Sequence, residues 1–307
     1  MRTGWLFILI GFNVFWSGTY SAFKDLKHWL NPGQVVTLRI GLAALLMLLC
    51  WRWLPGKSPH GRDLLKTCLM GVIVFVVTPR LQVIATQAGQ AGDMSVLVAL
   101  EPLVITLGAA LFLREHVPLN RWLGFLFGMI GVVLLSNIWQ PGFRLASLGA
   151  NLLFISSFFC GSAFSVMGKP LIDRSSFLKV ITLALAAGAV MNLALDGPST
   201  VAAARLLPVH AWLEIGYLST ICTAIGYTVW FAAMRVLPVN AMAMTIFLQP
   251  FAGTLIAVWL LGEHPHLGQL WGGLAIATGL VLGLRQGKRN SQDLVTPQDR
   301  ISLMIPD

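Results

Sequence analysis

Long apolar stretches separated by short polar connectors dominate the pattern of this sequence. A helix needs about 20 mostly apolar residues to cross a hydrocarbon core of about 30 Å. Ten stretches meet that length, at residues 4–22, 33–54, 65–86, 92–113, 119–138, 147–168, 177–195, 209–234, 240–262 and 267–285. The connectors hold helix-breaking sequences such as Asn31-Pro32-Gly33 and Gly197-Pro198. The pattern predicts an all-α integral membrane protein with ten transmembrane helices.

The composition excludes a soluble protein. Of the 307 residues, 56% are hydrophobic and only 11% are charged, whereas soluble domains carry about 25% charged residues. The net charge of +9 does not indicate a nucleic-acid partner, because the basic residues are dispersed over short connectors. The four cysteines lie in apolar runs without a Cys-x-x-Cys spacing, so no disulfide framework or zinc site is predicted.

The distribution of Lys and Arg predicts the orientation of the chain in the membrane. If the N-terminus is cytoplasmic, fifteen of the 21 basic residues fall on the cytoplasmic side. Four fall on the opposite side, namely Lys24, Lys27, Arg144 and Arg205. The excess of basic residues in cytoplasmic connectors therefore predicts that both termini are cytoplasmic. Residues 286–307 form a polar tail that is expected to be disordered.

The sequence contains an internal repeat. With a shift of 148 positions, residues 99–135 align without gaps on residues 247–283. The matched pairs include Pro102 with Pro250, Glu115 with Glu263, Gly124 with Gly272 and Gly131 with Gly279. Each repeat, 1–138 and 147–285, holds five predicted spans, and an odd number forces the two to insert with opposite orientations. Inverted repeats with a binding site at their interface are typical of secondary transporters.

Two short motifs recur in both repeats. The first repeat has Leu100-Glu101-Pro102-Leu103 followed by Leu113-Arg114-Glu115, and the second has Leu248-Gln249-Pro250-Phe251 followed by Leu260-Leu261-Gly262-Glu263. These motifs resemble the EamA family of the drug/metabolite transporter superfamily. The resemblance implies two inverted five-helix repeats around a central cavity, in an exporter of amino acids or related metabolites in the bacterial inner membrane. Gln249 departs from the family, which frequently has Glu there.

Other functions are less consistent with the sequence. Multidrug efflux by the same fold stays open as an alternative. A membrane-embedded enzyme acting on lipid would need His, Asp or Glu clustered at one membrane face, and the sequence has no such cluster. The sequence also has no Gly-x-x-x-x-Gly-Lys-Ser/Thr motif for ATP binding. We therefore expect no enzyme activity, no cofactor and no requirement for an ATPase subunit, with a small-molecule substrate and the lipid bilayer as partners.

Three ionisable side chains lie within predicted spans: Arg39, Arg80 and Glu101. Such groups cost about 2.5–3.5 kcal/mol on insertion scales, so they face the bundle interior and pair with one another. One expectation is that Glu101 pairs with one arginine, which leaves the other guanidinium free to bind a carboxylate of the substrate. The alternative is that both arginines tie helices together.

Further candidates come from polar and aromatic residues inside the spans. Asn13, Trp16 and Ser17 share one face of the first span. Ser162 is the counterpart of Ser17 at a shift of 145 positions, and Tyr227 and Trp230 are candidates for stacking on a substrate. Gln249 replaces Glu101 in the second repeat and is a candidate hydrogen-bonding partner. For each of these residues, plain packing between helices is the alternative.

The repeated prolines, glutamates and glycines have structural interpretations. Pro102 and Pro250 are predicted to kink their spans, either as hinges or as static bends. Glu115 and Glu263 are expected to be helix caps or ion-pair anchors. No metal site is predicted from His264 and its neighbours, because residues on opposite sides of a proline do not converge. Gly124 and Gly128 favour close helix packing or, alternatively, a homodimer contact.

Overall fold

The computed structural model describes residues 2–88, 97–136, 148–252 and 267–284, and all regular structure in these ranges is helical. The α-helices are α1 (Arg2–Ser17), α2 (Thr19–Leu26), α3 (Pro32–Leu49), α4 (Arg62–Val72), α5 (Thr78–Ala88), α7 (Glu101–Phe112), α8 (Leu119–Ser136), α9 (Leu148–Ile172), α10 (Phe177–Ala204), α11 (Val209–Gly216), α12 (Gly226–Met234), α13 (Val239–Met244) and α15 (Leu267–Leu284). The predicted all-α class is therefore confirmed.

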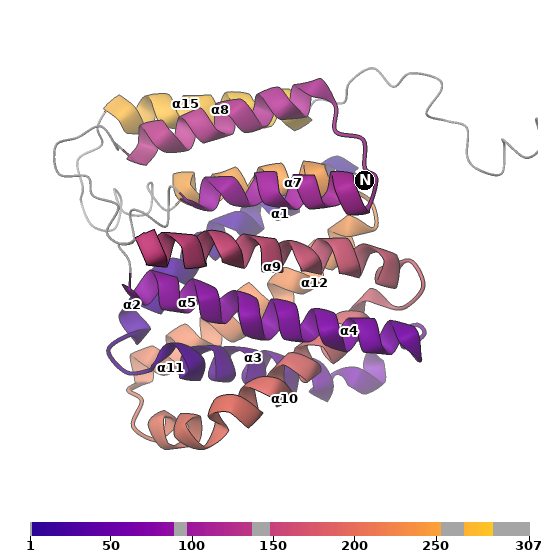
Figure 1. Cartoon of the computed structure of the whole chain (residues 1–307), viewed down its shortest axis with the longest axis vertical. Coiled ribbons are helices and arrows are strands. Elements are labelled where there is room, and N and C mark those ends of the chain that lie inside the picture. Colours follow the sequence, from indigo (N-terminus) through magenta and orange to yellow (C-terminus); the bar gives the residue numbers. More distant parts are fainter. Residues whose placement is uncertain (1, 89–96, 137–147, 253–266, 285–307) are drawn as a thin grey trace, which may run out of the picture.

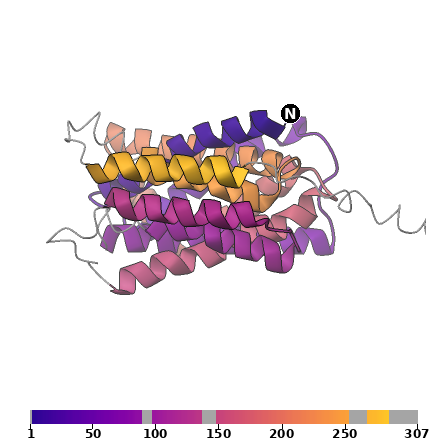
Figure 2. The ribbon, with the colours of Figure 1, turned by 90° about the horizontal axis from the view of Figure 1, so that it is seen from above.

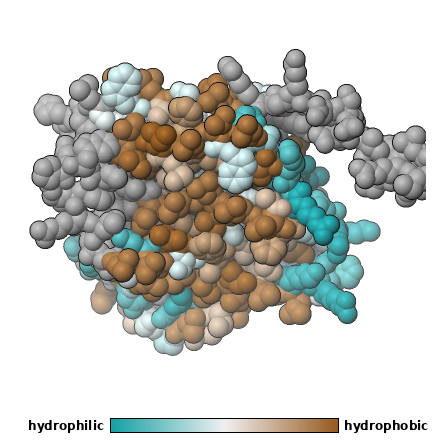
Figure 3. All heavy atoms as spheres, turned by 45° about the horizontal axis from the view of Figure 1, so that its top comes forward, coloured by the Kyte–Doolittle hydropathy of each residue, from teal (hydrophilic) through white to brown (hydrophobic). Residues whose placement is uncertain are grey.

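Six helical segments are long and apolar enough to cross a membrane: Thr3–Leu26, Pro32–Leu49, Arg62–Ala88, Leu148–Ile172, Phe177–Ala204 and Val209–Met234. Four shorter apolar segments fall at the other predicted spans: Val98–Phe112, Leu119–Leu134, Val239–Ala252 and Leu270–Leu284. A broad hydrophobic surface, with polar atoms gathered toward its edges, is visible in Figure 3. The chain thus has the composition and the surface of a multi-pass membrane protein.

One predicted boundary is wrong. Gly197-Pro198 was expected to end the seventh span at residue 195, but both residues lie inside α10, which continues to Ala204. The hydroxyls of Ser199 and Thr200 donate to the carbonyl of Asp196, at 3.0 and 2.7 Å. Proline is tolerated in a membrane helix when neighbouring groups satisfy the backbone around it. The connector to α11 is therefore residues 205–208.

The helices run side by side and form an elongated bundle (Figures 1 and 2). The pair α8 and α15 lies at one end of the long axis of the bundle, and α3 and α10 lie at the other end. The helices α1, α7, α9 and α12 occupy the middle of Figure 1. Segments from both repeats therefore alternate through the bundle, so the two repeats do not form separate domains.

Repeated glycines bring α8 and α15 into close contact. A Cβ on Gly124 would lie 2.7 Å from the carbonyl oxygen of Gly279, and one on Gly131 would lie 2.7 Å from that of Gly272. Residue numbers rise along α8 as they fall along α15, so the two helices are antiparallel. The shift of 148 positions relates Gly124 to Gly272 and Gly131 to Gly279, so it converts each of these two contacts into the other. The α8–α15 contact therefore has the symmetry of a local two-fold axis.

The same packing decides the role of the Gly124–Gly128 pair. A Cβ on Gly128 would lie 2.8 Å from the ring of Phe247, while Gly124 is covered by α15. The glycines therefore serve close helix packing within the chain, which was one of the two alternatives. This face is not available for contact with a second copy.

Two π-helical segments interrupt corresponding spans of the repeats. Ile73–Val77 joins α4 to α5, and Tyr217–Ile225 joins α11 to α12. The hydroxyl of Thr78 donates to the carbonyl of Ile73 at 3.0 Å, and that of Thr223 donates to the carbonyl of Leu218 at 2.7 Å. Both residues of the second pair lie 145 positions after those of the first. Such π-bulges are frequent at functional sites.

The two repeated prolines also follow similar local structure. A 3-10 turn at Val98–Leu100 directly precedes Glu101 and Pro102, and another at Thr245–Phe247 precedes Pro250. Proline has no N–H for the carbonyl four residues before it, and its ring clashes with that carbonyl. The helices therefore change pitch beside both prolines. A hinge motion at these positions stays a prediction.

Gly131→Ala should destabilise the protein, because the added methyl group would meet the carbonyl oxygen of Gly272. We expect a loss of about 1–3 kcal/mol, the usual cost of overpacking. Gly11→Ala is the matched control, since a Cβ on Gly11 meets nothing within 4 Å. Thermal unfolding in one detergent measures both variants. Equal melting temperatures for the two would contradict the contact between α8 and α15.

Candidate functional site

A cavity of about 100 Å³ lies between helices of the two repeats. Its walls come from α1, α2, α3, α5, α7, α9 and α12 and from the segment around residues 246–249. The lining residues are Trp16, Thr19, Tyr20, Arg39, Thr78, Gln82, Glu101, Ile105, Gly161, Phe164, Ser165, Tyr227, Trp230, Ile246 and Gln249. The cavity therefore combines aromatic walls, one cation and one carboxyl group.

Several residues that line the cavity occupy corresponding positions in the two repeats. Trp16, Thr19 and Tyr20 in the first repeat occupy positions that lie 145 residues before Gly161, Phe164 and Ser165 in the second. Glu101 and Gln249 are related in the same way by a shift of 148 positions. The cavity thus lies between equivalent helix faces. The charges break this equivalence, because Arg39 corresponds to an alanine and Glu101 to an amide.

The aromatic walls are held in fixed orientations by hydrogen bonds and ring contacts. The indole N–H of Trp16 donates to the carbonyl of Cys222 at 2.8 Å, and that of Trp230 donates to the hydroxyl of Ser165 at 3.1 Å. The ring of Trp16 lies 6.1 Å from that of Tyr227 and 6.0 Å from that of Trp230, measured between centroids. Tilted and edge-to-face contacts of this kind stabilise the pairs. The walls are therefore preorganised.

Arg39 supplies the positive charge of the cavity. Arg39 is only 5% exposed. Its Nε donates to the hydroxyl of Thr223 at 2.7 Å, and its Cζ lies 5.5 Å from the ring centroid of Phe23. Thr223 lies in the second π-helical segment, so this segment positions the guanidinium. Within the described residues, Nη1 and Nη2 make no hydrogen bond. The hydroxyl of Thr19, which also lines the cavity, is buried without a partner there as well.

Glu101 supplies the negative charge, at the first residue of α7. The predicted ion pair of Glu101 with an arginine is wrong, because none of the ion pairs among the described residues includes it. Tyr20 and Tyr227 line the same cavity as Glu101 and Arg39. The cavity therefore presents a cation and a carboxyl group that are not bonded to each other.

Gln249 and Asn13 form one polar network. The amide of Gln249 donates to Oδ1 of Asn13 at 2.8 Å, and the amide of Asn13 donates to the hydroxyl of Thr245 at 2.9 Å and to the carbonyl of Leu9 at 2.8 Å. Asn13 is fully buried behind the cavity wall and is not part of the lining. Its role in the structure is to orient Gln249, which does line the cavity.

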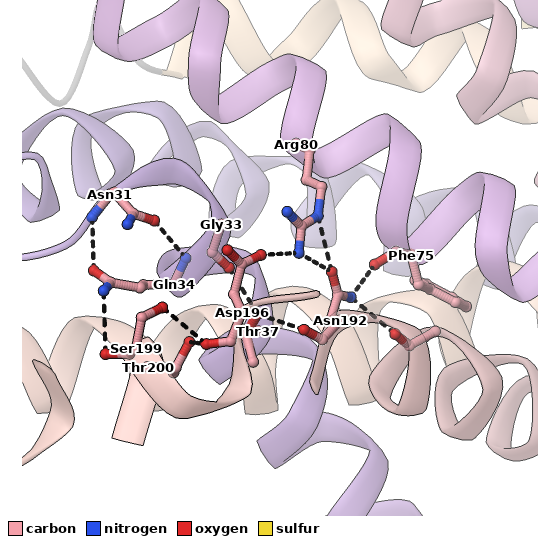
Figure 4. Close-up of polar contacts among 11 residues, drawn as sticks. Asn31, Gly33, Gln34, Thr37, Phe75, Arg80, Asn192, Asp196, Ser199 and Thr200 are labelled. Atoms are coloured by element: carbon pink, nitrogen blue, oxygen red, sulfur yellow. Dashed lines mark hydrogen bonds and ion pairs between the residues drawn. The ribbon is translucent and has the colours of Figure 1, made fainter. Parts of the chain in front are cut away.

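Arg80 lies outside the cavity lining and ties α5 to α10 (Figure 4). Its Nη2 pairs with Oδ2 of Asp196 at 2.5 Å, and its Nε and Nη2 donate to Oδ1 of Asn192 at 3.0 and 2.8 Å. A Cβ on Gly33 of α3 would lie 2.6 Å from the same Asp196 oxygen. The alternative in which this arginine ties helices together therefore fits the structure.

Pro79 lies directly beside this network. Phe75 belongs to the π-helical segment one turn earlier, and Pro79 has no N–H to donate to a carbonyl of that turn. The amide of Asn192 donates to the carbonyl of Phe75 at 2.9 Å. The oxygen of the same amide is then available to Arg80, whose remaining charge is balanced by Asp196. The adjacent residues Pro79 and Arg80 are therefore parts of one arrangement.

The remaining candidates have local roles. The hydroxyl of Ser17 donates to the carbonyl of Val14, and that of Ser162 donates to the carbonyl of Phe159. Neither serine lines the cavity. Sequence reasoning missed Thr19, Thr78, Gln82, Gly161 and Phe164 as lining residues. The shift of 145 positions, applied to Trp16 and Thr19, would have identified Gly161 and Phe164 as their counterparts.

The expectation that Glu115 caps a helix is confirmed. Its Oε1 accepts from the backbone N–H of Val239 at 3.0 Å, and its Oε2 accepts from the backbone and amide of Asn240 at 3.1 and 2.8 Å. These donors belong to the first turn of α13, so a carboxylate of the first repeat caps a helix of the second. Glu263 and His264 lie outside the described residues.

The apolar helices and the cavity between them are consistent with a multi-pass membrane transporter. The EamA-like transporter family matches residues 3–137 and 147–285, so the chain belongs to this family. It is 27% identical to a probable terminal-alkyne amino-acid exporter of Streptantibioticus cattleyicolor over 91% of this chain and 94% of that protein. It is 21% identical to the uncharacterized transporter YyaM of Bacillus subtilis, over 89% and 91% of the two chains.

Two further comparisons bear on the fold and the range of substrates. A riboflavin transporter of Vibrio cholerae is 29% identical, over 57% of this chain and 56% of that protein. A solved crystal structure superposes with a TM-score of 0.72, at 16% identity, over 92% of this chain and 97% of that one. The superposition supports the fold alone. The family and the named relatives are transporters and not enzymes.

Asp196→Asn should destabilise the bundle, because it leaves the Arg80 charge without a counter-ion. We expect a loss of about 1 kcal/mol, because both side chains of the pair are partly exposed and Arg80 keeps its hydrogen bonds to Asn192. The double variant Arg80→Gln with Asp196→Asn should recover part of that loss, since it removes both charges. Unfolding in detergent of the two single variants and the double variant gives the coupling. Strictly additive losses would show that the pair does not stabilise the protein.

Proposed function

We propose that this protein is a secondary transporter that exports small metabolites, namely amino acids or related compounds, across the bacterial inner membrane by alternating access. The observation that carries the proposal is the cavity between the repeats. It holds a guanidinium with two unbonded nitrogens, a carboxyl group without an ion-pair partner in the described residues, and preorganised aromatic walls. Buried charges left in this state within a membrane bundle are suited to a charged ligand.

The arrangement suits a zwitterion with an apolar or aromatic side chain. A substrate carboxylate can accept two hydrogen bonds from Nη1 and Nη2 of Arg39, a geometry that guanidinium favours. A substrate ammonium group can interact with Glu101, which lines the same cavity. The rings of Trp16, Tyr227 and Trp230 then offer an apolar surface to the side chain. The amino-acid exporter among the relatives supports this substrate class.

Alternating access is supported by the repeated features of the bundle. The glycine contacts of α8 and α15 exchange under the repeat, the π-helical segments correspond, and a 3-10 turn precedes each repeated proline. Two inverted five-helix repeats would rock around a fixed site at their interface, as in other secondary transporters. Pro102 and Pro250 would then serve as the hinges.

Arg39→Lys should weaken substrate binding about tenfold, because lysine keeps the charge but loses the two-bond geometry. The substrate is first found by overexpressing the chain in a host exposed to toxic amino acids and drugs. Counterflow of the labelled substrate in liposomes then compares wild type with Arg39→Lys, Glu101→Gln and the exposed control Arg174→Lys. Wild-type rates in the first two variants would overturn the proposed site. Rescue from drugs alone would instead favour multidrug efflux.

The proposed orientation predicts which connectors are periplasmic. Reporter fusions after Trp29 and Leu206 should report the periplasm, and fusions after Pro55 and Arg174 should report the cytoplasm. All four sites lie outside the long helices, and Leu206 lies just beyond α10, which ends at Ala204. The reverse pattern at either pair is incompatible with two cytoplasmic termini and inverted repeats.

A further inference from the structure

A second and larger cavity lies on the outside of the bundle, in a groove between α3 and α10. Its volume is about 670 Å³, and its walls are almost entirely aliphatic. Small residues create the groove, because Gly41 and Ala44 on α3 face Ala186, Ala189 and Gly197 on α10. Small residues on facing helices normally allow two backbones to pack tightly. Here they leave space that no described side chain fills.

The groove opens toward the surroundings of the bundle. Leu45 on one wall is 53% exposed, and Val190 and Val201 on the other are 68% and 55% exposed. A Cβ built on Gly41 would meet nothing within 4 Å, so the floor of the groove is unobstructed at that residue. In a membrane protein this exposed apolar surface faces hydrocarbon. An empty groove of this volume would forfeit dispersion contacts along its whole length, so hydrocarbon fills it.

One end of the groove carries the polar groups. Arg205, which follows the last residue of α10, and Trp212 of α11 both line it. The side chain of Arg205 makes no ion pair or hydrogen bond with a described residue, and neither does the indole N–H of Trp212. Tryptophan and arginine beside a helix end are typical of the level of lipid headgroups. The groove therefore has an apolar length and a cationic end.

We propose that this groove is a binding site for one phospholipid, with an acyl chain along α3 and α10 and the phosphate at Arg205 and Trp212. From Thr37 to Leu48 the groove follows α3 for about 16 Å, at 1.5 Å per residue. That distance is about half of a 30 Å hydrocarbon core, which is the depth of one leaflet. The positive charge of Arg205 complements the phosphate that all phospholipids carry.

A second copy of the chain fits the groove less well. A two-fold dimer through this face would set the groove against itself. Two concave surfaces would leave a void, and the two Arg205 side chains would lie on the same interface. A bound lipid fills the groove without such a void and without bringing two Arg205 side chains onto one interface.

The site also lies on a seam that polar contacts hold together. The amide of Gln34 on α3 donates to the carbonyl of Ser199 at 3.2 Å, and the hydroxyl of Thr37 donates to the carbonyl of Asn192 at 3.4 Å. Asn192 is also the partner of Arg80 in Figure 4. A phospholipid in the groove would therefore contact the two helices that this network joins, and its binding would stabilise their contact.

The test uses the full chain in mild detergent and phosphatidylglycerol as the added lipid, with native mass spectrometry to count bound molecules. Gly41→Leu fills the groove at an unobstructed position and should abolish retention of the lipid. Gly11→Leu is its matched control, because Gly11 is also a helical glycine with open space at Cβ but lies outside the groove. It should retain one lipid, as wild type does.

The headgroup contact is tested separately. Arg205→Gln should bind phosphatidylglycerol about tenfold more weakly, as expected for the loss of one charge-assisted contact. It should bind diacylglycerol, which has no phosphate, as well as wild type does. Retention of lipid by Gly41→Leu at the wild-type level would overturn the proposal. So would a wild-type dimer that Gly41→Leu converts to a monomer, since the occupant would then be a second copy.

Discussion

The cost of leaving a polar group unbonded in hydrocarbon determines how this bundle is built. No water is present in the membrane core to replace a missing hydrogen bond, so polar groups must find partners within the chain. The network beside Pro79 is an example. In the turn before this proline, the carbonyl of Phe75 accepts from Asn192, whose amide oxygen accepts from Arg80, and the charge of Arg80 is balanced by Asp196.

Buried polar atoms without a partner also occur elsewhere among the described residues, for example at Thr106 and Asn151, but three groups without partners gather in one cavity. Two nitrogens of Arg39, the carboxyl group of Glu101 and the hydroxyl of Thr19 have no hydrogen-bond partner in the described residues, and all three residues line one cavity. Arg39 is buried and Arg80 is half-buried, and both carry the same guanidinium group within apolar spans. What separates them is whether the chain itself satisfies the guanidinium. For this reason we propose that Arg80 belongs to the scaffold and Arg39 binds the ligand.

The repeat explains the frame of the cavity but not its charge. Residues 16, 19 and 20 line the cavity together with residues 161, 164 and 165, and the hydroxyls of Thr78 and Thr223 donate to carbonyls of the two π-helical segments, all at one shift of 145 positions. Arg39 and Glu101 have no charged equivalents in the second half. A pseudosymmetric frame permits two related conformations, whereas an asymmetric pair of charges gives the ligand one orientation. The proposed transport cycle needs both properties in the same cavity.

The sequence was sufficient to predict the helical class and the positions of the apolar helical segments, because hydrophobic length is a local property. It also placed Trp16, Arg39 and Glu101 among the candidates, since polar groups inside apolar spans are conspicuous. The separation of Arg39 from Arg80 was not predictable, because it depends on Asn192 and Asp196, which are more than 100 residues from Arg80. The extent of α10 was missed because tertiary hydrogen bonds support the helix around Pro198.

Filling the cavity is the most direct test of whether the substrate binds there. Gly161 lines it, and a Cβ there would make only an ordinary contact with Thr78, so Gly161→Leu adds volume to the cavity without disturbing the backbone. Equilibrium binding of the exported substrate to purified protein, together with the melting temperature, compares this variant with Gly11→Leu. We expect Gly161→Leu to lose saturable binding of the substrate and to keep the melting temperature of wild type. Wild-type affinity with the cavity filled would contradict the proposed site, because the substrate would then bind elsewhere.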